Sequence, residues 1–286
     1  MAAKTKRNIG IFIVSIFLLT GCGVFRKARL PEVLEVPLPK ATSTEVSPEE
    51  EALLKKRAFS VGERLTYSVR WTGIHVGHAT LEVKDIIAFN GYRAYKVISQ
   101  AQSNDFFSLI YRVEDIVQSF IDINKFHSLR LDKRQEEGNY RSFKITEYDQ
   151  VNHMARQFKY KYRDGSVEEQ KFSIPPDVHD ILSCFYYLRN QDLKVGESIF
   201  IKVNADDKNY DLEVKVHKKE RIEIQDLGAY DAILVEPLAK FQGIFVRKGK
   251  ILIWVTDDSR KIPLLMKSKI PMGSIVAVLE KIEGHD

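Results

Sequence analysis

Leu65-Thr66-Tyr67-Ser68-Val69-Arg70-Trp71 alternates apolar side chains with polar ones. A period of two is typical of a β-strand that buries one face and exposes the other. The same alternation recurs at residues 81–84 and 158–163. Asp164-Gly165 then predicts a tight hairpin, and residues 73–77 predict another. These patterns indicate an all-β fold that is mainly antiparallel.

Two further runs, at residues 251–255 and 275–279, are apolar on both faces. Such strands lie in the middle of a sheet or against a second layer. One helix is expected at residues 177–189, because Pro175-Pro176 ends a strand and Asp177 can act as the cap. Its apolar residues follow at helical spacing: Val178, Ile181, Leu182, Phe185 and Leu188. We expect this stripe to pack on the sheet.

The chain also contains an internal repeat, because the motif Val61-Gly62-Glu63 recurs as Val195-Gly196-Glu197. Other positions recur at nearly the same offset: residues 81–84 with 212–215, Asp122 with Asp257, Leu129 with Leu264, and Gly138 with Gly273. The pattern predicts two similar meander halves, about 58–174 and 193–282, joined by the helix. They would surround one interior or form one long, curved, barrel-like sheet. The alternative is that no duplication occurred, because any two meanders of similar strand length produce such matches.

The N-terminus is typical of a bacterial lipoprotein. A basic cluster precedes an apolar run at residues 9–19, which leads into Leu19-Thr20-Gly21-Cys22. The run is too short to cross a hydrocarbon core of about 30 Å. We expect residues 1–21 to be a signal peptide and Cys22 to be lipidated, with palmitate among its acyl chains. The alternative is an uncleaved anchor with a chance cysteine.

Residues 22–57 would comprise the lipidated cysteine, a flexible tether and a short helix, followed by the strand-rich domain at 58–286. Ser47-Pro48 with Glu50 forms a capping box, and we expect the helix to end near Arg57. An aspartate after the lipidated cysteine would favour the inner membrane in enterobacterial sorting, but this chain has Gly23. The predicted location is therefore the outer membrane, with the periplasmic face favoured over the surface.

Charge and cysteine content exclude two classes of protein. The formal net charge of +5 falls to +2 in the mature chain, because Lys4, Lys6 and Arg7 leave with the signal peptide. Charges of both signs are interspersed, so we expect no nucleic-acid partner. Only Cys184 remains after lipidation, so an internal disulfide is impossible and packing alone must hold the domain.

Several motifs together resemble the bacterial envelope proteins grouped as domain-of-unknown-function family 3108. The motifs are residues 61–67, Trp71-Thr72-Gly73-Ile74 with Gly77, residues 175–177 and 180–183, Tyr187-Leu188-Arg189, and residues 254–258 with Arg260 and Pro263. The resemblance covers roughly residues 58–282. It implies an exported, strand-rich domain with barrel-like curvature, and it leaves the function open.

Three groups of residues suggest catalysis or metal binding at first sight. His75 and His78 share one hairpin, but a spacing of three puts them on opposite faces of a continuous strand, so we expect no metal and no cofactor. Cys184 shares the apolar helix stripe while His179 does not, which favours a buried structural thiol. Ser183 lacks the Gly-x-Ser-x-Gly turn of a hydrolase.

Carboxylates have structural interpretations as well. Asp177 or Asp180 would favour the helix N-terminus, and Arg189 would complement its C-terminus or pair with a strand carboxylate. Asp257-Asp258 with Arg260, and Asp115 with Asp122, resemble the paired carboxylates of a glycosidase. Adjacent residues that leave a strand point apart, so we interpret the first pair as a turn.

Aromatic residues supply the candidate binding site. Residues 104–111 place apolar groups on both faces of an expected strand, and Phe241 and Phe245 stand at the same offset in the second half. Either these residues are simply core, or they line a shared apolar interior. The predicted ligand-binding residues are Trp71, Phe106, Phe107, Tyr111, Phe241 and Phe245.

The sequence therefore favours a lipid-anchored, non-enzymatic envelope protein that binds an apolar or amphiphilic component within a curved sheet. Its partners would be the membrane, through the N-terminal lipid, and a lipid-like ligand or an envelope protein. The alternative is a structural module that contacts another envelope protein or the cell wall through a sheet face or edge. A hydrolase of cell-wall polymer is the third hypothesis, and it would need two convergent catalytic groups in a cleft.

Overall fold

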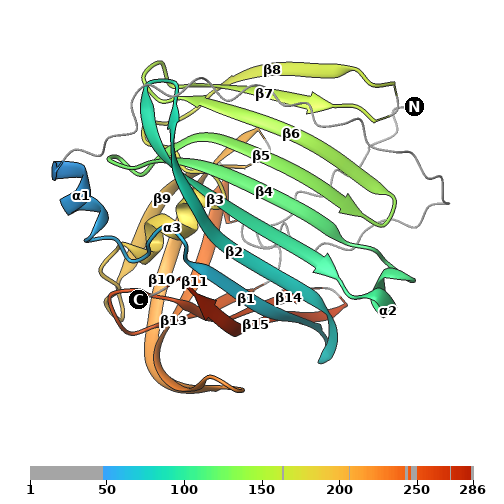
Figure 1. Ribbon diagram of the computed structural model, residues 1–286, viewed down its shortest axis with the longest axis vertical. Coiled ribbons are helices and arrows are strands. Elements are labelled where there is room, and N and C mark those ends of the chain that lie inside the picture. Colours follow the sequence, from blue (N-terminus) through green and yellow to red (C-terminus); the bar gives the residue numbers. More distant parts are fainter. Residues whose placement is uncertain are drawn as a thin grey trace.

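The computed structural model describes residues 48–284, apart from residues 163, 206, 242–243, 246–249 and 271 and the side chains of residues 240, 241, 244 and 245. Its strands form one curved antiparallel sheet with the order β8-β7-β6-β5-β4-β3-β2-β1-β15-β14-β13-β11-β10-β9 (Figure 1). The short β12 pairs with β11 off this path. The all-β, antiparallel prediction is confirmed, in the form of one long curved sheet.

The first half of the chain supplies eight consecutive neighbours. They are β1 (Arg64–Trp71), β2 (Ile74–Phe89), β3 (Tyr92–Ser103), β4 (Glu114–Asp122), β5 (Ser128–Glu137), β6 (Tyr140–Asp149), β7 (Met154–Tyr160) and β8 (Val167–Ser173). The second half supplies β9 (Ser198–Ala205), β10 (Lys208–Ile224), β11 (Gly228–Phe241), β12 (Ile244–Phe245), β13 (Ile251–Thr256), β14 (Pro263–Ile270) and β15 (Gly273–Glu283).

The two halves join where β1 pairs with β15, so the first strand of the sheet bonds to the last. Val69 stands opposite Ala277 in this pairing. As predicted from their apolar faces, β13 and β15 lie in the middle of the strand order rather than at an edge. The edges of the described sheet are β8 and β9.

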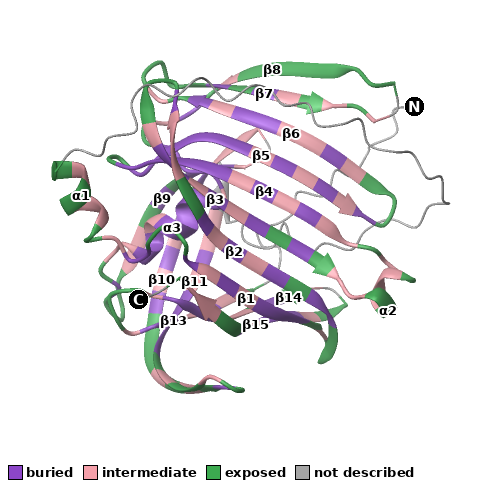
Figure 2. Cartoon of the chain, viewed as in Figure 1, coloured by how far each residue is buried: buried purple, intermediate pink, exposed green. Residues whose placement is uncertain are grey.

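Within the described residues, three short helices accompany the sheet: α1 (Pro48–Leu54), α2 (Asp105–Ser108) and α3 (Ser183–Arg189). The predicted helix before the domain is α1, which ends before Arg57, and Ser47 lies outside the described residues. α3 contacts β4 in one wall of the sheet and β9 in the other. Buried residues concentrate on α3 and the strands around it (Figure 2), so this helix closes one end of the core.

The prediction of a helix over residues 177–189 is wrong in its first half. Residues 177–182 are not helical, because His179 forms a parallel bridge with Val203 of β9. The Asp180 carboxylate then accepts the backbone N–H groups of Leu182 and Ser183, at 2.7 and 2.9 Å. Asp180, not Asp177, therefore satisfies the start of the helix.

The repeated Val-Gly-Glu motif has similar backbone geometry at its two positions. Gly62 and Gly196 have φ angles of 94° and 87°, a region that glycine adopts without strain. Each donates its N–H to a valine carbonyl of the following long strand, Val83 for Gly62 at 2.8 Å and Val216 for Gly196 at 2.9 Å. The repeated Val-Gly-Glu motif thus makes the same entry into a strand in both halves.

Candidate functional site: an apolar pocket at the open end of the sheet

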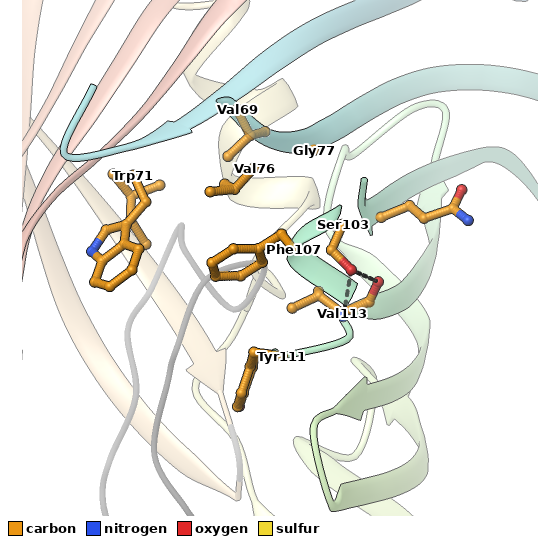
Figure 3. A pocket seen from close by; sticks show the side chains of 10 residues that line it. Val69, Trp71, Val76, Gly77, Ser103, Phe107, Tyr111 and Val113 are labelled. Carbon is orange, nitrogen blue, oxygen red and sulfur yellow. Dashed lines mark hydrogen bonds between the residues drawn. The ribbon is translucent and has the colours of Figure 1, made fainter. Parts of the chain in front are cut away.

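A small apolar pocket lies at the end of the sheet that carries α2 (Figure 3). Its lining residues come from β1, β2, β3, β15 and the α2 segment: Val69, Trp71, Val76, Gly77, Gln102, Ser103, Phe107, Tyr111, Val113 and Ile275. Its volume is about 40 Å³, which is room for roughly three water molecules. The lining offers dispersion contacts and few polar partners, so an apolar group suits it.

The aromatic side of the pocket is held in place by polar contacts at its margin. The Asn104 side chain accepts the Phe107 N–H at 2.7 Å and so starts α2. Phe107 then meets Trp71 edge-on, with ring centroids 6.0 Å apart. The Trp71 Nε1–H donates to the Met272 carbonyl at 3.0 Å, which leaves only the apolar part of the indole for the pocket.

Three of the predicted binding residues line this pocket: Trp71, Phe107 and Tyr111. Phe106 does not, because residues 104–111 contain one helical turn instead of the expected strand. Successive side chains of a helix diverge, and Phe106 is 73% exposed. It is therefore neither core nor lining. The side chains of Phe241 and Phe245 lie outside the described residues.

Four aliphatic lining residues were missed by sequence reasoning, namely Val69, Val76, Val113 and Ile275. Val69 belongs to the alternating stretch that predicted the first strand. Its place on the buried face of that strand could therefore have been read from the sequence. The approach of Ile275 depends on the pairing of β1 with β15, in which Trp71 stands opposite Ile275. Residues this far apart in the chain leave no local signal of their contact.

A buried carboxyl pair lies behind Tyr111. The Tyr111 ring packs against Gly138, where an added Cβ would lie 2.8 Å from the ring. The residue before it, Glu137, and Asp115 of β4 are both buried. Glu137 accepts from Gln135 Nε2 at 3.0 Å, and Asp115 accepts the Glu136 N–H at 2.9 Å.

Burial raises the pKa of Asp115 to about 6. Burial and the nearby Asp115 charge raise the pKa of Glu137 to about 8. Two carboxylates in one buried site repel each other, so the pair holds one proton at neutral pH. The carboxylate partner of Asp115 is thus Glu137. Asp122, which the sequence offered beside Asp115 as a possible carboxylate pair, accepts the N–H groups of Asn124 and Lys125 in a turn.

This proton predicts a pH dependence of stability. Both pKa values are higher in the folded chain than in an unfolded one, so the folded state binds the extra proton and loses stability as pH rises from about 4.5 to 8. Each extra proton contributes up to about 1.4 kcal/mol per pH unit. The slope is therefore steeper below pH 6, where both carboxyls are protonated in the folded state, than between pH 6 and 8, where one of them is. Urea unfolding across this range should show the fall in the native chain, and Glu137→Gln should flatten it. Glu114→Gln, which alters a partly exposed carboxylate of the same strand, is the control. An unchanged slope in Glu137→Gln would contradict the shared proton.

The structure gives the other candidate catalytic residues structural contacts. Ser183 Oγ lies 2.6 Å from Ser128 Oγ and accepts the Asp180 N–H, in a fully buried network. Cys184 is buried, and burial raises the pKa of its thiol. Asp258 accepts the N–H groups of Arg260 and Lys261, which confirms the predicted turn.

The placement of His75 and His78 on opposite faces is wrong. A β-bulge makes Val69 face Gly77 and Arg70 face His75, so Val76 is an extra residue. The bulge brings the two imidazoles together, with ring centroids 4.7 Å apart. Among the described residues no three His, Cys, Asp or Glu side chains are placed to hold a metal.

A second, larger hollow of about 560 Å³ lies near the β2–β3 hairpin and the β6–β7 turn. Its lining includes the charged side chains Glu147, Asp149, Arg156 and Lys171. An apolar ligand would displace the water that hydrates these charged groups without offering hydrogen bonds in its place, which costs free energy. This hollow therefore suits polar molecules, and the pocket beside α2 suits apolar ones.

A family model described as protein of unknown function (DUF3108) matches residues 66–280. The chain belongs to the DUF3108 family. This confirms the resemblance carried by the sequence motifs. No curated protein sequence matches this DUF3108 member.

Two solved structures are similar to this DUF3108 protein. One is a β-barrel-like protein of family DUF1849 from Brucella abortus, with 10% sequence identity, a TM-score of 0.52, and coverage of 79% of this chain and 98% of that chain. The other is a protein with a YmcC-like fold from Bacteroides fragilis, with 8% identity, a TM-score of 0.34, and coverage of 79% and 97%. The first likeness shows the fold alone. No helix of the described chain has the length and apolar character needed to span a membrane.

Proposed function

We propose that this protein is a lipid-anchored, non-enzymatic binding protein of the bacterial envelope. Its curved sheet would take up an apolar or amphiphilic envelope component. The observation that carries this proposal is the apolar pocket between Trp71, Phe107 and Tyr111. It lies beside α2, at the end of the sheet away from α3 (Figure 1). We favour a role without catalysis because the described Ser183, Cys184 and Asp258 side chains serve packing, capping and turns.

The dimensions of the pocket restrict the ligand. A volume of about 40 Å³ accepts the end of an acyl chain or one small apolar group. Each buried methylene contributes about 0.8 kcal/mol, so a ligand held only here would bind weakly and exchange readily. The remainder of an amphiphile would extend past Phe107 and Tyr111 into solvent or a membrane.

The proposed anchor rests on the sequence at Cys22, which lies outside the described residues. The 25 residues that separate Cys22 from Pro48 would form the tether. Two or more acyl chains on one cysteine hold a protein stably to a bilayer. The domain would then work close to the membrane, most favourably the periplasmic face of the outer membrane.

The full chain with Cys22→Ser tests both parts of the proposal. We expect the native chain to sediment with membranes and to carry diacylglycerol on its first residue by mass spectrometry. Cys22→Ser should lose that mass and the processing at residue 21. Organic extracts of the purified native protein, corrected for covalent lipid with the Cys22→Ser form, should contain a bound amphiphile. An unmodified Cys22 would overturn the anchor, and a domain that is empty and does not exchange added acyl chains would overturn the binding role.

A further inference from the structure

Five large apolar side chains project into solvent at the pocket end of the sheet, and we call them the apolar rim. Their exposed fractions are far above those of core residues: Ile74 64%, Phe106 73%, Leu109 82%, Ile110 75% and Met272 62%. Large apolar residues that gather on one surface mark contact with a partner or a membrane.

Backbone pairing places the members of the apolar rim together. Ile74 lies at the tip of the β1–β2 hairpin and Met272 at the tip of the β14–β15 hairpin, and these hairpins are neighbours because β1 pairs with β15. The Trp71 side chain bonds to the Met272 carbonyl across the two tips. The α2 segment joins them through Asn104, whose N–H donates to Val76 of β2 at 2.8 Å.

Cations stand directly behind the apolar rim, on the outer face of the same strands. Arg70 of β1 and Lys267 of β14 both pair with Val276 of β15 and thus share one row, and Lys269 follows on the same face of β14. All three side chains are exposed, and among the described residues none of them forms an ion pair. We call these three residues the basic band. Asp105 on α2, which directly precedes Phe106, is the acidic residue closest in sequence to the apolar rim.

The order of these groups matches the cross-section of a bilayer surface. At about 3.3 Å per residue, the basic band lies roughly 7 to 15 Å behind the hairpin tips. An apolar surface that enters a membrane interface reaches about 5 to 10 Å deep. The basic band would therefore reach the phosphates when the apolar rim enters the acyl region. A partner protein would be expected to meet a flatter surface than two hairpin tips and one helical turn.

We propose that the apolar rim and the basic band dock this protein onto an anionic phospholipid bilayer. This inference does not require that the pocket hold a ligand. It places Trp71, which joins the apolar rim to the pocket, at the membrane surface. An acyl chain would then pass between the bilayer and the pocket without crossing water.

The proposed anchor is compatible with this orientation. α1 and α2 lie at opposite ends of the molecule (Figure 1), so the tether joins the domain at the end away from the apolar rim. A tether of 25 residues reaches about 85 Å when extended. The longest strand in this direction, β2, has 16 residues and spans about 50 Å. The tether is thus long enough for the apolar rim to reach the membrane that holds the anchor.

Vesicle sedimentation tests the docking surface, with residues 23–286, which retain every described helix and strand. The probe is phosphatidylcholine vesicles with and without phosphatidylglycerol. We expect binding to require phosphatidylglycerol and to weaken with salt. Phe106→Ser/Leu109→Ser should weaken binding by about tenfold or more, and Arg70→Gln/Lys269→Gln should remove most of the salt dependence.

A matched control separates this proposal from folding defects. Val151→Ser/Phe200→Ser alters side chains that are 74% and 68% exposed elsewhere, and it should leave vesicle binding unchanged. Ile74→Ser/Met272→Ser provides an independent rim variant if the first one fails to fold. Equal binding by the native chain and both rim variants, or equal loss in the control, would overturn the proposal.

Discussion

Replacing Arg189 with methionine is expected to lower the free energy of unfolding by about 3–5 kcal/mol, because it leaves a buried carboxylate without its partner. Arg189 Nη1 and Nη2 lie 2.5 and 2.7 Å from the two Glu63 oxygens. Both side chains are almost completely buried. The guanidinium also donates to the carbonyls of Ala58 and Arg260, so it ties α3 to the start of β1 and to the β13–β14 turn.

Urea unfolding measures this loss, and Arg260→Met is its matched control. Arg260 pairs with Asp258 at 2.9 Å while both side chains remain partly exposed, so its loss should cost no more than about 1 kcal/mol. Glu63→Leu/Arg189→Met should recover part of the stability, since a buried pair replaced as a whole leaves no unpaired charge. A loss below 1 kcal/mol in Arg189→Met would contradict this role of the ion pair.

Asp180→Ala is expected to cost about 3 kcal/mol or more, because it leaves several buried donors without an acceptor. The Asp180 carboxylate accepts from Ser119 Oγ at 2.6 Å and Ser128 Oγ at 2.7 Å, in addition to the N–H groups of Leu182 and Ser183. It therefore fastens the start of α3 to β4 and β5. Burial raises the pKa of this carboxyl, and the four donors act against that rise.

Asp177→Ala is the matched control for this prediction, because Asp177 was the other candidate for the helix cap. Its side chain is 71% exposed and contacts only the His127 imidazole, at 3.1 Å, among the partners described. We expect a loss below about 1 kcal/mol. Thermal unfolding of both variants gives the comparison, and equal losses would contradict the assignment of Asp180 as the cap.

The strands were predictable from sequence because their side chains alternate with the period of the fold. Leu65, Tyr67 and Val69 are buried in the structure, as their alternation requires. The pairing of β1 with β15 was not predictable, because nothing local to Trp71 indicates a partner at Ile275. The Arg189 partner was foreseen only as a type, a strand carboxylate, and it proved to be Glu63, which directly precedes β1.

The predictions from sequence failed where a local polar contact or a bulge outweighs the periodicity of the apolar side chains. Asn104 caps α2 and turns an expected strand into a helix, which moves Phe106 out of the pocket and keeps Phe107 in it. Asp180 likewise shortens the predicted helix to α3. One bulged residue, Val76, reverses the predicted faces of the two histidines. Short polar side chains and bulges therefore limited the prediction of the site more than that of the sheet.

Fluorescence quenching by a brominated single-chain amphiphile, kept below the concentration at which it forms micelles, tests the proposed binding role most directly. The chain has two tryptophans. Trp71 lines the pocket, whereas Trp254 donates to Glu220 at 2.8 Å from β13. In Trp254→Phe, all tryptophan fluorescence therefore comes from Trp71 in the pocket. In Trp71→Phe it comes from Trp254, which serves as a control outside the pocket.

We expect saturable quenching of Trp71 in the Trp254→Phe chain, weakened by the added Val76→Phe, and no saturable quenching of Trp254 in the Trp71→Phe chain. Absence of quenching at Trp71, or equal quenching at both tryptophans, would contradict an apolar ligand in this pocket.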